Sequence, residues 1–232
     1  AGGTALSSGI YYSDLLRKQG MKARFARGGS NKYLVKMLEE GLVDYILDGQ
    51  TFDLEGVRSM RENAGHVNTS PFTSYNYHGK GNFAQFVDVV ILGATEVDVN
   101  FNANVVTHSD GYLLHGIGGW MNCLFSKCVI LPIPLFRDRM PVICDEVTTI
   151  CGPGELIDVI VTERGIAINP LRPDLIEKMK GSPLPIKSLH ELKAEAEKIC
   201  GKPQKAHLTD EVVAVIKWVD GTVIDSVFRI DK

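Results

Sequence analysis

One segment of the sequence carries polar side chains at the spacing of a ligand-binding strand. Residues 96–105 read EVDVNFNANV, so acidic and asparagine side chains alternate with apolar ones. In an extended segment this alternation points the polar side chains to one face; they are Glu96, Asp98, Asn100, Asn102 and Asn104. Asparagine both donates and accepts hydrogen bonds, which suits a polyhydroxylated or polycarboxylated ligand, although a solvated strand edge has the same pattern.

Two glycine-rich segments could bind an anion through their backbone. Ser109-Asp110-Gly111 is followed by Gly116-Ile117-Gly118-Gly119, a loop that can present successive N–H groups to an oxyanion. It is not the dinucleotide-binding fingerprint, because Cys123 lies near the third glycine position, and a flexible surface loop is the alternative. Gly2 and Gly3 precede a helix-like stretch, where a phosphate site and a plain tight turn are both open.

The titratable residues are less informative. Five cysteines form no CxxC pair, and six histidines include none at metal-ligand spacing, so we expect reduced thiols and no metal site. His108 and His115 flank the glycine loop and could contact a substrate, but only their place in the sequence indicates this. Glu163 and Arg164 follow an apolar run, where a structural role is the simpler interpretation.

The elements that must position these residues follow from apolar periodicity. Continuous apolar runs predict strands buried on both faces, at 86–94, 127–132 and 156–162. Helical spacing and stop signals predict helices over 5–19, 32–40, 120–127, 174–180 and 189–198. Asp220-Gly221 between β-rich runs predicts a hairpin over 212–229. We therefore expect one α/β domain over 1–232, with an open, mainly parallel sheet, helices on both faces and a terminal β-hairpin.

Composition excludes several classes of protein. The 232 residues are 44% apolar and 23% charged, with a net charge of −3, so nothing indicates nucleic-acid or membrane binding. We expect a cytoplasmic protein, since no apolar run reaches the length of a bilayer span. The chain opens on Ala-Gly-Gly-Thr without Met, from which we expect a preceding segment that carries half of any active site.

Taken in order, several segments resemble the C-terminal half of citrate lyase alpha chains. The resemblance rests on AGGTAL, KARFARGGSNKYLVKMLEEGLVDYILDGQTFD, VVILGATEVDVNFNANVVTHSDG, GIGG, VTERGIAINPLRPDL and the terminal VVAVIKWVDGTVIDSV. More distantly, the chain is similar to the butyrate-type coenzyme A transferases. The resemblance implies a transferase that exchanges acetyl for citryl on coenzyme A or on the coenzyme-A-derived arm of an acyl carrier protein.

The butyrate-type enzymes differ from this chain at one informative position. They use a glutamate that becomes a covalent thioester, and the matching position here holds Arg24, which cannot be a carboxylate nucleophile. The resemblance therefore implies attack by citrate's own carboxylate, with Arg24 suited to hold a carboxylate. A butyrate-type transferase or thioesterase, a non-catalytic thioester-binding and assembly half, and a sugar-phosphate isomerase remain alternatives.

The resemblance also implies roles for individual residues. Gly118 and Gly119 would stabilise an oxyanion through their N–H groups, with Arg24 and Glu96 as further catalytic candidates. The substrate-binding candidates are Asn102, Asn104, Asp98 and Ser109, and those for the carrier are Gly2, Gly3 and Gly116. The implied partners are citrate, an acetyl thioester, and the beta (citryl lyase) and gamma (acyl carrier) chains of an oligomeric complex.

Overall fold

The structure, a computed structural model, describes residues 3–70, 83–203 and 205–231. The chain divides into two compact units, Ala1–Phe83 and Ala84–Lys232. The single domain expected over 1–232 stays a prediction. In the described ranges, no helix is both long and apolar enough to cross a bilayer.

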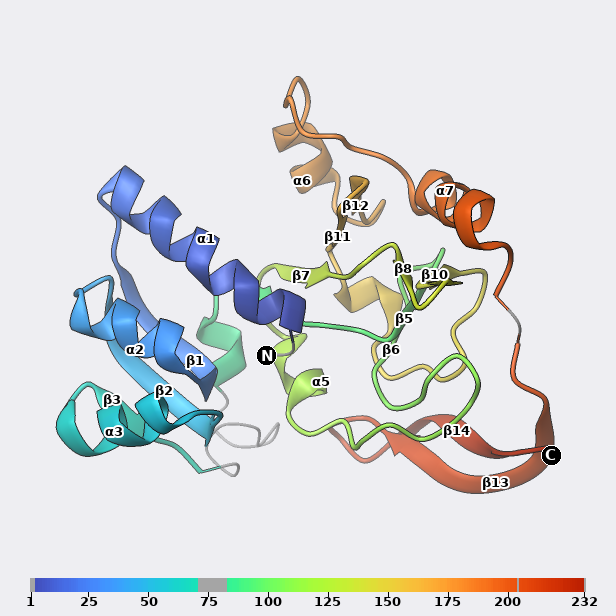
Figure 1. The fold of residues 1–232 in the computed structure, drawn as a ribbon, viewed down its shortest axis with the longest axis horizontal. Coiled ribbons are helices and arrows are strands. Elements are labelled where there is room, and N and C mark those ends of the chain that lie inside the picture. Colours follow the sequence, from blue (N-terminus) through green and yellow to red (C-terminus); the bar gives the residue numbers. More distant parts are fainter. Residues whose placement is uncertain (1–2, 71–82, 204, 232) are drawn as a thin grey trace. The chain divides into compact units, whose positions relative to one another are not determined.

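In its described residues, the first unit has a parallel sheet and three helices (Figure 1). Strands β1 and β2 pair in parallel, and β2 pairs in the same way with β3. The elements are α1 (Gly3–Gln19), β1 (Ala23–Ser30), α2 (Lys32–Glu39), β2 (Val43–Thr51), α3 (Leu54–Glu62) and β3 (His66–Asn68). The helices predicted over 5–19 and 32–40 are confirmed, and α1 begins two residues earlier than expected.

Local signals set the boundaries of these elements. Helix α1 is followed by Gly20 at φ 62°, a conformation that glycine adopts without steric cost. Asn31 caps α2, since its side-chain oxygen accepts hydrogen bonds from the backbone N–H groups of Tyr33 and Leu34. The apolar core of this unit joins α1 and α2 to the sheet through Leu16, Met37, Val43 and Ile46.

The second unit divides its strands among several small sheets (Figure 1). One sheet has the order β12-β11-β7-β4, parallel except for β12; a second has the order β10-β5-β6, in which β10 and β5 are parallel. The strands are β4 (Val90–Ile91), β5 (Glu96–Asp98), β6 (Ala103–Asn104), β7 (Val129–Pro132), β8 (Phe136–Arg137), β9 (Met140–Pro141), β10 (Ile143–Cys144), β11 (Val159–Thr162) and β12 (Gly165–Ile168).

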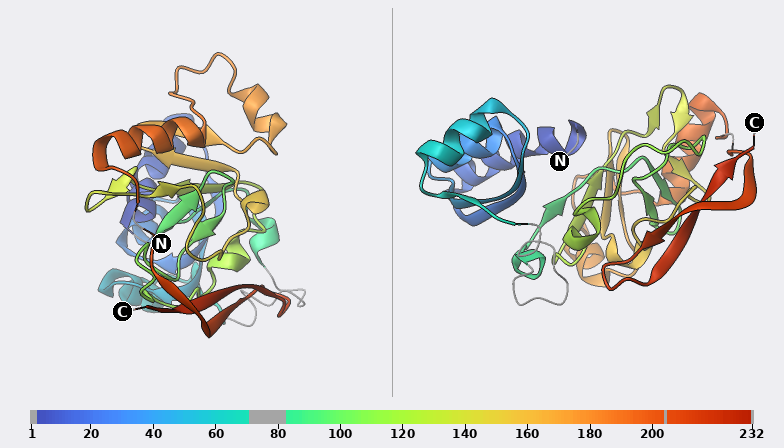
Figure 2. Two further views of the ribbon diagram at one scale, coloured as in Figure 1. Left: turned by 90° about the vertical axis from the view of Figure 1, so that its right-hand side faces the viewer. Right: turned by 90° about the horizontal axis from the view of Figure 1, so that it is seen from below.

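The remaining elements of this unit are helices and the terminal hairpin. The helices are the 3₁₀ segments η1 (Phe83–Phe86) and η2 (Gly154–Leu156), and α5 (Trp120–Cys123), α6 (Pro173–Lys178) and α7 (Leu189–Cys200). Helix α7 begins with a capping box, in which Ser188 and Glu191 satisfy each other's backbone N–H groups. The hairpin pairs β13 (Leu208–Lys217) with β14 (Val223–Ile230), at the opposite end of the unit from α6 (Figures 1 and 2).

The fold class is as predicted: α/β, with mainly parallel sheets and a β-hairpin at the end. Among the predicted elements that are shorter than expected, two differ most. The strand expected over 86–94 is reduced to β4, because Phe86 and Val89 are 58% and 44% exposed and the run is not buried throughout. The helix expected over 120–127 ends at Cys123, after which the Ser126 N–H donates to Cys123 O in a tighter turn.

Candidate functional site

The polar segment 96–105 forms a tight antiparallel hairpin between β5 and β6, so the prediction of one extended segment is wrong. Glu96 pairs with Asn104 in the register, and Val97 pairs with Ala103. The turn is held by Asp98, whose Oδ1 accepts hydrogen bonds from the N–H groups of Asn100 (2.9 Å) and Asn102 (3.0 Å). Polar side chains that alternation would place in a row along one strand therefore meet across the hairpin.

Asn104 has every hydrogen-bonding position of its side chain filled. Its Nδ2 donates to Glu96 Oε2 (2.9 Å) and to Thr107 Oγ1 (2.8 Å). Its Oδ1 accepts from the N–H groups of Val106 (3.0 Å) and Thr107 (3.1 Å). A side-chain amide has two N–H donors and an oxygen with two lone pairs, so none is left for a ligand in this arrangement. The residue is also 0% exposed.

Glu96 and Asn102 link the same hairpin to a distant segment of the chain. Glu96 is 4% exposed and accepts from the N–H of Thr148 at 2.9 Å. Asn102 donates to Asp98 Oδ2 at 3.0 Å and accepts from the N–H of Gly154 at 2.9 Å. We call two groups of hydrogen-bonded side chains together the turn cluster: Asp98 with Asn102, and Asn104 with Glu96 and Thr107. It fixes the hairpin against residues 148–154, and the catalytic and binding roles expected for its members stay predictions.

The glycine loop differs from the turn cluster in its backbone hydrogen bonding. Gly118 has φ 60°, and Gly119 is the N-cap of α5. Within the described residues, the N–H groups of Gly118 and Gly119 donate to no protein acceptor. Gly116 is exposed, and its carbonyl oxygen lies 2.8 Å from Nδ1 of His115. Two adjacent N–H groups in this loop are thus available to an external acceptor.

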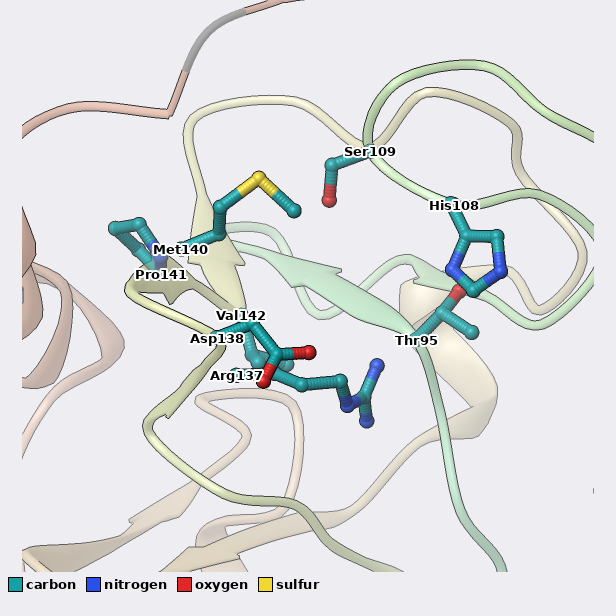
Figure 3. A pocket seen from close by; sticks show the side chains of 8 residues that line it. All are labelled: Thr95, His108, Ser109, Arg137, Asp138, Met140, Pro141 and Val142. Atoms are coloured by element: carbon teal, nitrogen blue, oxygen red, sulfur yellow. The ribbon is translucent and has the colours of Figure 1, made fainter.

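A small pocket is lined by residues that include Thr95 and His108, the chain neighbours of Glu96 and Thr107 in the turn cluster; Figure 3 shows its lining side chains. Its volume is about 90 Å³, and its apolar lining comes from Met140, Pro141 and Val142. The polar lining consists of Thr95, His108, Ser109, Arg137 and Asp138. Thr95 connects the pocket to the cluster, because its Oγ1 lies 2.8 Å from Asn104 O and 2.9 Å from Thr107 O.

This pocket is lined by two residues that the sequence singled out as possible substrate contacts, His108 and Ser109, and by two charged residues that it did not single out. Ser109 was expected to bind substrate, and its side chain lines the pocket with the neighbouring His108 (Figure 3). Arg137 and Asp138 were missed because they lie about 30 residues further along, in the hairpin of β8 and β9. The available signal was the charged sequence Arg137-Asp138-Arg139 between two apolar segments.

The predicted site residues of the first unit are Arg24, Gly2 and Gly3. Arg24 is an exposed residue of β1. Gly3 is the first residue of α1, and Gly2 lies outside the described residues. Their expected roles stay predictions.

The first unit also contains a buried carboxylate that the sequence did not single out. Asp48 is 1% exposed near the carboxyl end of β2. Burial raises its pKa, but hydrogen bonds from the hydroxyls of Thr51 (2.7 Å) and Ser30 (2.8 Å) outweigh burial and hold that pKa below its usual value. Asp48 thereby ties the end of β1 to the end of β2.

The cysteines are free thiols, as expected. Burial raises the pKa of Cys144 to about 12 and that of Cys151 to about 11, so both stay protonated at neutral pH. Among the described residues, no three His, Cys, Asp or Glu side chains gather as metal ligands.

Comparison with known proteins assigns the chain to a family. The sequence model of the family "Citrate lyase, alpha subunit" matches residues 1–230. The citrate lyase alpha chain of Haemophilus influenzae is 38% identical over 99% of this chain and 46% of its own length. That of Escherichia coli K12 is 37% identical over 100% of this chain and 46% of its own length. The chain thus spans about half the length of these relatives.

A solved structure agrees with both the family and the fold. A citrate lyase alpha subunit from Streptococcus mutans, solved in complex with citrate, superposes with a TM-score of 0.91 at 41% identity. The superposition covers 94% of this chain and 43% of that one. With the match to the family's sequence model and the similarity to curated relatives, this establishes that the chain belongs to the citrate lyase alpha subunit family.

Proposed function

We propose that this chain forms part of a transferase that exchanges the acetyl group for citryl on a coenzyme-A-like thiol. The thioester would be carried by coenzyme A or by the coenzyme-A-derived arm of an acyl carrier protein. Family membership supports the proposal, and so does the Streptococcus mutans relative, which was solved in complex with citrate. The observation that carries it is the pair of N–H groups at Gly118 and Gly119 that no acceptor in the described residues uses.

The reaction would proceed in two acyl transfers. A citrate carboxylate oxygen attacks the carbonyl carbon of the acetyl thioester, and the thiolate leaves, giving an acetyl–citryl anhydride. The thiolate then attacks the citryl carbonyl of the anhydride, and acetate leaves. The net change is acetyl thioester plus citrate to citryl thioester plus acetate. No covalent bond to the protein is formed at any stage.

Both steps place negative charge on a carbonyl oxygen, which the glycine loop would stabilise. Backbone N–H groups suit this task because they are already positioned before charge develops, and losing one such donor costs about 10²–10³ in rate. Holding citrate and the thioester in attack geometry would supply much of the remaining acceleration, on the order of 7–11 kcal/mol.

Arg24 argues against a covalent enzyme thioester in this proposal. It stands where the resemblance to butyrate-type transferases calls for a glutamate, and a guanidinium cannot form a thioester. The complex would also contain a citryl lyase chain and an acyl carrier chain, as implied by the family. Both partners are part of the proposal.

The test mixes acetyl-coenzyme A and citrate with the chain, alone and combined with the complementary half of a full-length citrate lyase alpha chain. Mass spectrometry then looks for citryl-coenzyme A, acetate and any coenzyme A adduct of the protein. We expect citryl-coenzyme A and no adduct. An adduct would favour a butyrate-type mechanism. Absence of product with both coenzyme A and carrier thioesters would instead favour a non-catalytic binding half.

Glu96 provides a sharper test of where the chemistry resides. Its Oε2 accepts from Asn104 Nδ2 and from the Thr148 N–H, and the single amide oxygen of a glutamine of the same shape can preserve both contacts. If Glu96 positions the hairpin, Glu96→Gln should retain activity within about tenfold. A loss of several orders of magnitude in kcat, with the fold intact, would make Glu96 the catalytic carboxylate expected from the sequence.

A further inference from the structure

The pocket beside the turn cluster contains polar groups that the protein itself leaves unused. Arg137 makes one long contact, from Nη2 to Ala94 O at 3.5 Å, and forms no ion pair with any described residue. The His108 ring and the Ser109 hydroxyl likewise have no hydrogen-bond partner among the residues that the structure describes. A guanidinium, an imidazole and a hydroxyl therefore face one small space (Figure 3).

The backbone of the turn that carries Arg137 is energetically unfavourable. Strands β8 and β9 are joined by Asp138 at φ 46° and Arg139 at φ 65°, both in the left-handed region that favours glycine. Two positive φ angles in a two-residue hairpin are typical of turns built from Asn-Gly. Here two charged residues occupy these positions. Such outliers concentrate at ligand sites, which points to a role for side chains on this turn.

We propose that this pocket binds the 2-hydroxycarboxylate end of the substrate. Arg137 would pair with the carboxylate, and Asp138 would accept a hydrogen bond from the hydroxyl group. The inference rests on the proposed function for the identity of the substrate as citrate. A volume of about 90 Å³ is too small for a whole drug-sized ligand, which needs about 300 Å³ or more, but it fits one end of a small acid.

Each polar group of the pocket has a part in this recognition. Arg137 supplies the planar donor fork that matches a carboxylate. Ser109 and His108 can each donate a further hydrogen bond to the carboxylate oxygens. Asp138 would repel a ligand that is only anionic, so the ligand must also bring a donor to that carboxylate. A hydroxyl next to a carboxylate satisfies both requirements at once.

The neighbouring turn cluster keeps the pocket in shape. Thr95 donates inward to the carbonyl oxygens of Asn104 and Thr107, and its hydroxyl proton is thereby unavailable to a ligand. Val142, at the pocket wall, accepts from the Val97 N–H of β5 at 2.9 Å. The pocket is therefore attached to the buried hairpin on two sides, which reduces the reorganisation needed to bind.

The test is calorimetric binding of citrate, and of tricarballylate, which has the three carboxylates without the hydroxyl. It uses the chain combined with the complementary half of a relative, at fixed ionic strength. Arg137→Gln should weaken citrate binding at least about tenfold. The matched control is Arg139→Gln, which removes the same charge from the same turn but does not line the pocket, and should stay within about twofold.

Asp138→Asn tests the second half of the proposal, because asparagine tolerates positive φ and keeps an oxygen acceptor. Wild-type protein should bind citrate about tenfold more tightly than tricarballylate. Asp138→Asn should reduce this ratio, because it should raise the affinity for tricarballylate. Thermal unfolding of each variant checks that the fold is intact. Equal effects of the two arginine variants, no citrate binding at millimolar concentration, or an unchanged preference in Asp138→Asn would each overturn the inference.

Binding and turnover separate this inference from the proposed function. If citrate binds and depends on Arg137 but no citryl thioester forms, the pocket assignment stands and the transferase proposal fails. If transfer occurs and Arg137→Gln has the wild-type KM for citrate, the pocket assignment fails and the transferase proposal stands.

Discussion

The turn cluster and the neighbouring pocket are built from similar residue types but use them in opposite ways. In the cluster, the Asn104 amide is saturated and the Glu96 and Asp98 carboxylates accept several hydrogen bonds within the protein. In the pocket, Ser109 and Arg137 find almost no partner among the described residues. A saturated polar group holds structure, whereas an unsatisfied one at the surface is free to bind.

This difference has an energetic consequence. Removing a member of the cluster leaves its buried partners without hydrogen bonds, which costs stability. Removing a group that faces the pocket leaves only solvent-accessible space, which costs binding and little stability. The free energy of unfolding is therefore the quantity that separates the two regions.

The largest effect is expected for Asn104→Ala. The change removes four hydrogen bonds from a site that is 0% exposed and leaves Glu96 and Thr107 without a shared partner. We expect the free energy of unfolding to fall by about 3–5 kcal/mol, measured by urea denaturation. The matched control is Asn100→Ala, the same substitution at an exposed asparagine of the same turn, which should cost under about 0.5 kcal/mol.

The chemical reactivity of the Cys151 thiol provides a second measurement of the effect of Asn104→Ala. Its Sγ lies 3.8 Å from Asn104 Oδ1, and burial raises the pKa of the thiol to about 11. The native thiol should resist iodoacetamide at about pH 8 and become reactive in Asn104→Ala as the cluster opens. Equal stability of the two asparagine variants would refute the view of the cluster as a structural framework.

A smaller loss is expected for Asp98→Ala. Asp98 Oδ1 accepts the Asn100 and Asn102 N–H groups of the turn, and Oδ2 accepts from the Asn102 side chain. These donors are only partly buried, so water can replace some of the lost bonds, and we expect a cost of about 2 kcal/mol in urea unfolding. A variant as stable as wild type would mean that the turn forms without its carboxylate.

The features of this site that the sequence could predict are the local ones, whereas contacts between residues far apart in the sequence could not be predicted. Residue types and spacing singled out 96–105 and Ser109, whose functional roles stay predictions, and apolar runs correctly predicted the fold class. Alternation alone could not reveal that the segment folds back at Phe101, which adopts φ 67°. Nor could it place Arg137 beside Ser109, because that proximity depends on how β8 and β9 pack in the folded unit.

Gly118→Ala tests the glycine loop, and its expected effect on stability is smaller than that of Asp98→Ala. Gly118 has φ 60°, where a side chain costs about 1–2 kcal/mol, although its added Cβ would meet nothing within 4 Å. We expect a stability loss of about 1 kcal/mol, and a larger proportional loss of citryl transfer as the N–H groups are redirected. The control is Gly93→Ala, which should change neither stability nor citryl transfer, because an added Cβ there also meets open space and φ is not positive.

The smallest effect on stability is expected for Ser109→Ala, and this makes it the sharpest test of the contrast. The hydroxyl has no partner within the described part of the chain, so its removal breaks no internal hydrogen bond. The free energy of unfolding should stay within about 0.5 kcal/mol of wild type in the urea experiment that measures Asn104→Ala. Citrate affinity should nevertheless fall severalfold, because a pocket that binds a carboxylate loses one of its donors. A stability loss above about 1 kcal/mol with unchanged affinity would show that Ser109 belongs with the structural residues, and the boundary between framework and binding site would then have to be drawn beyond it.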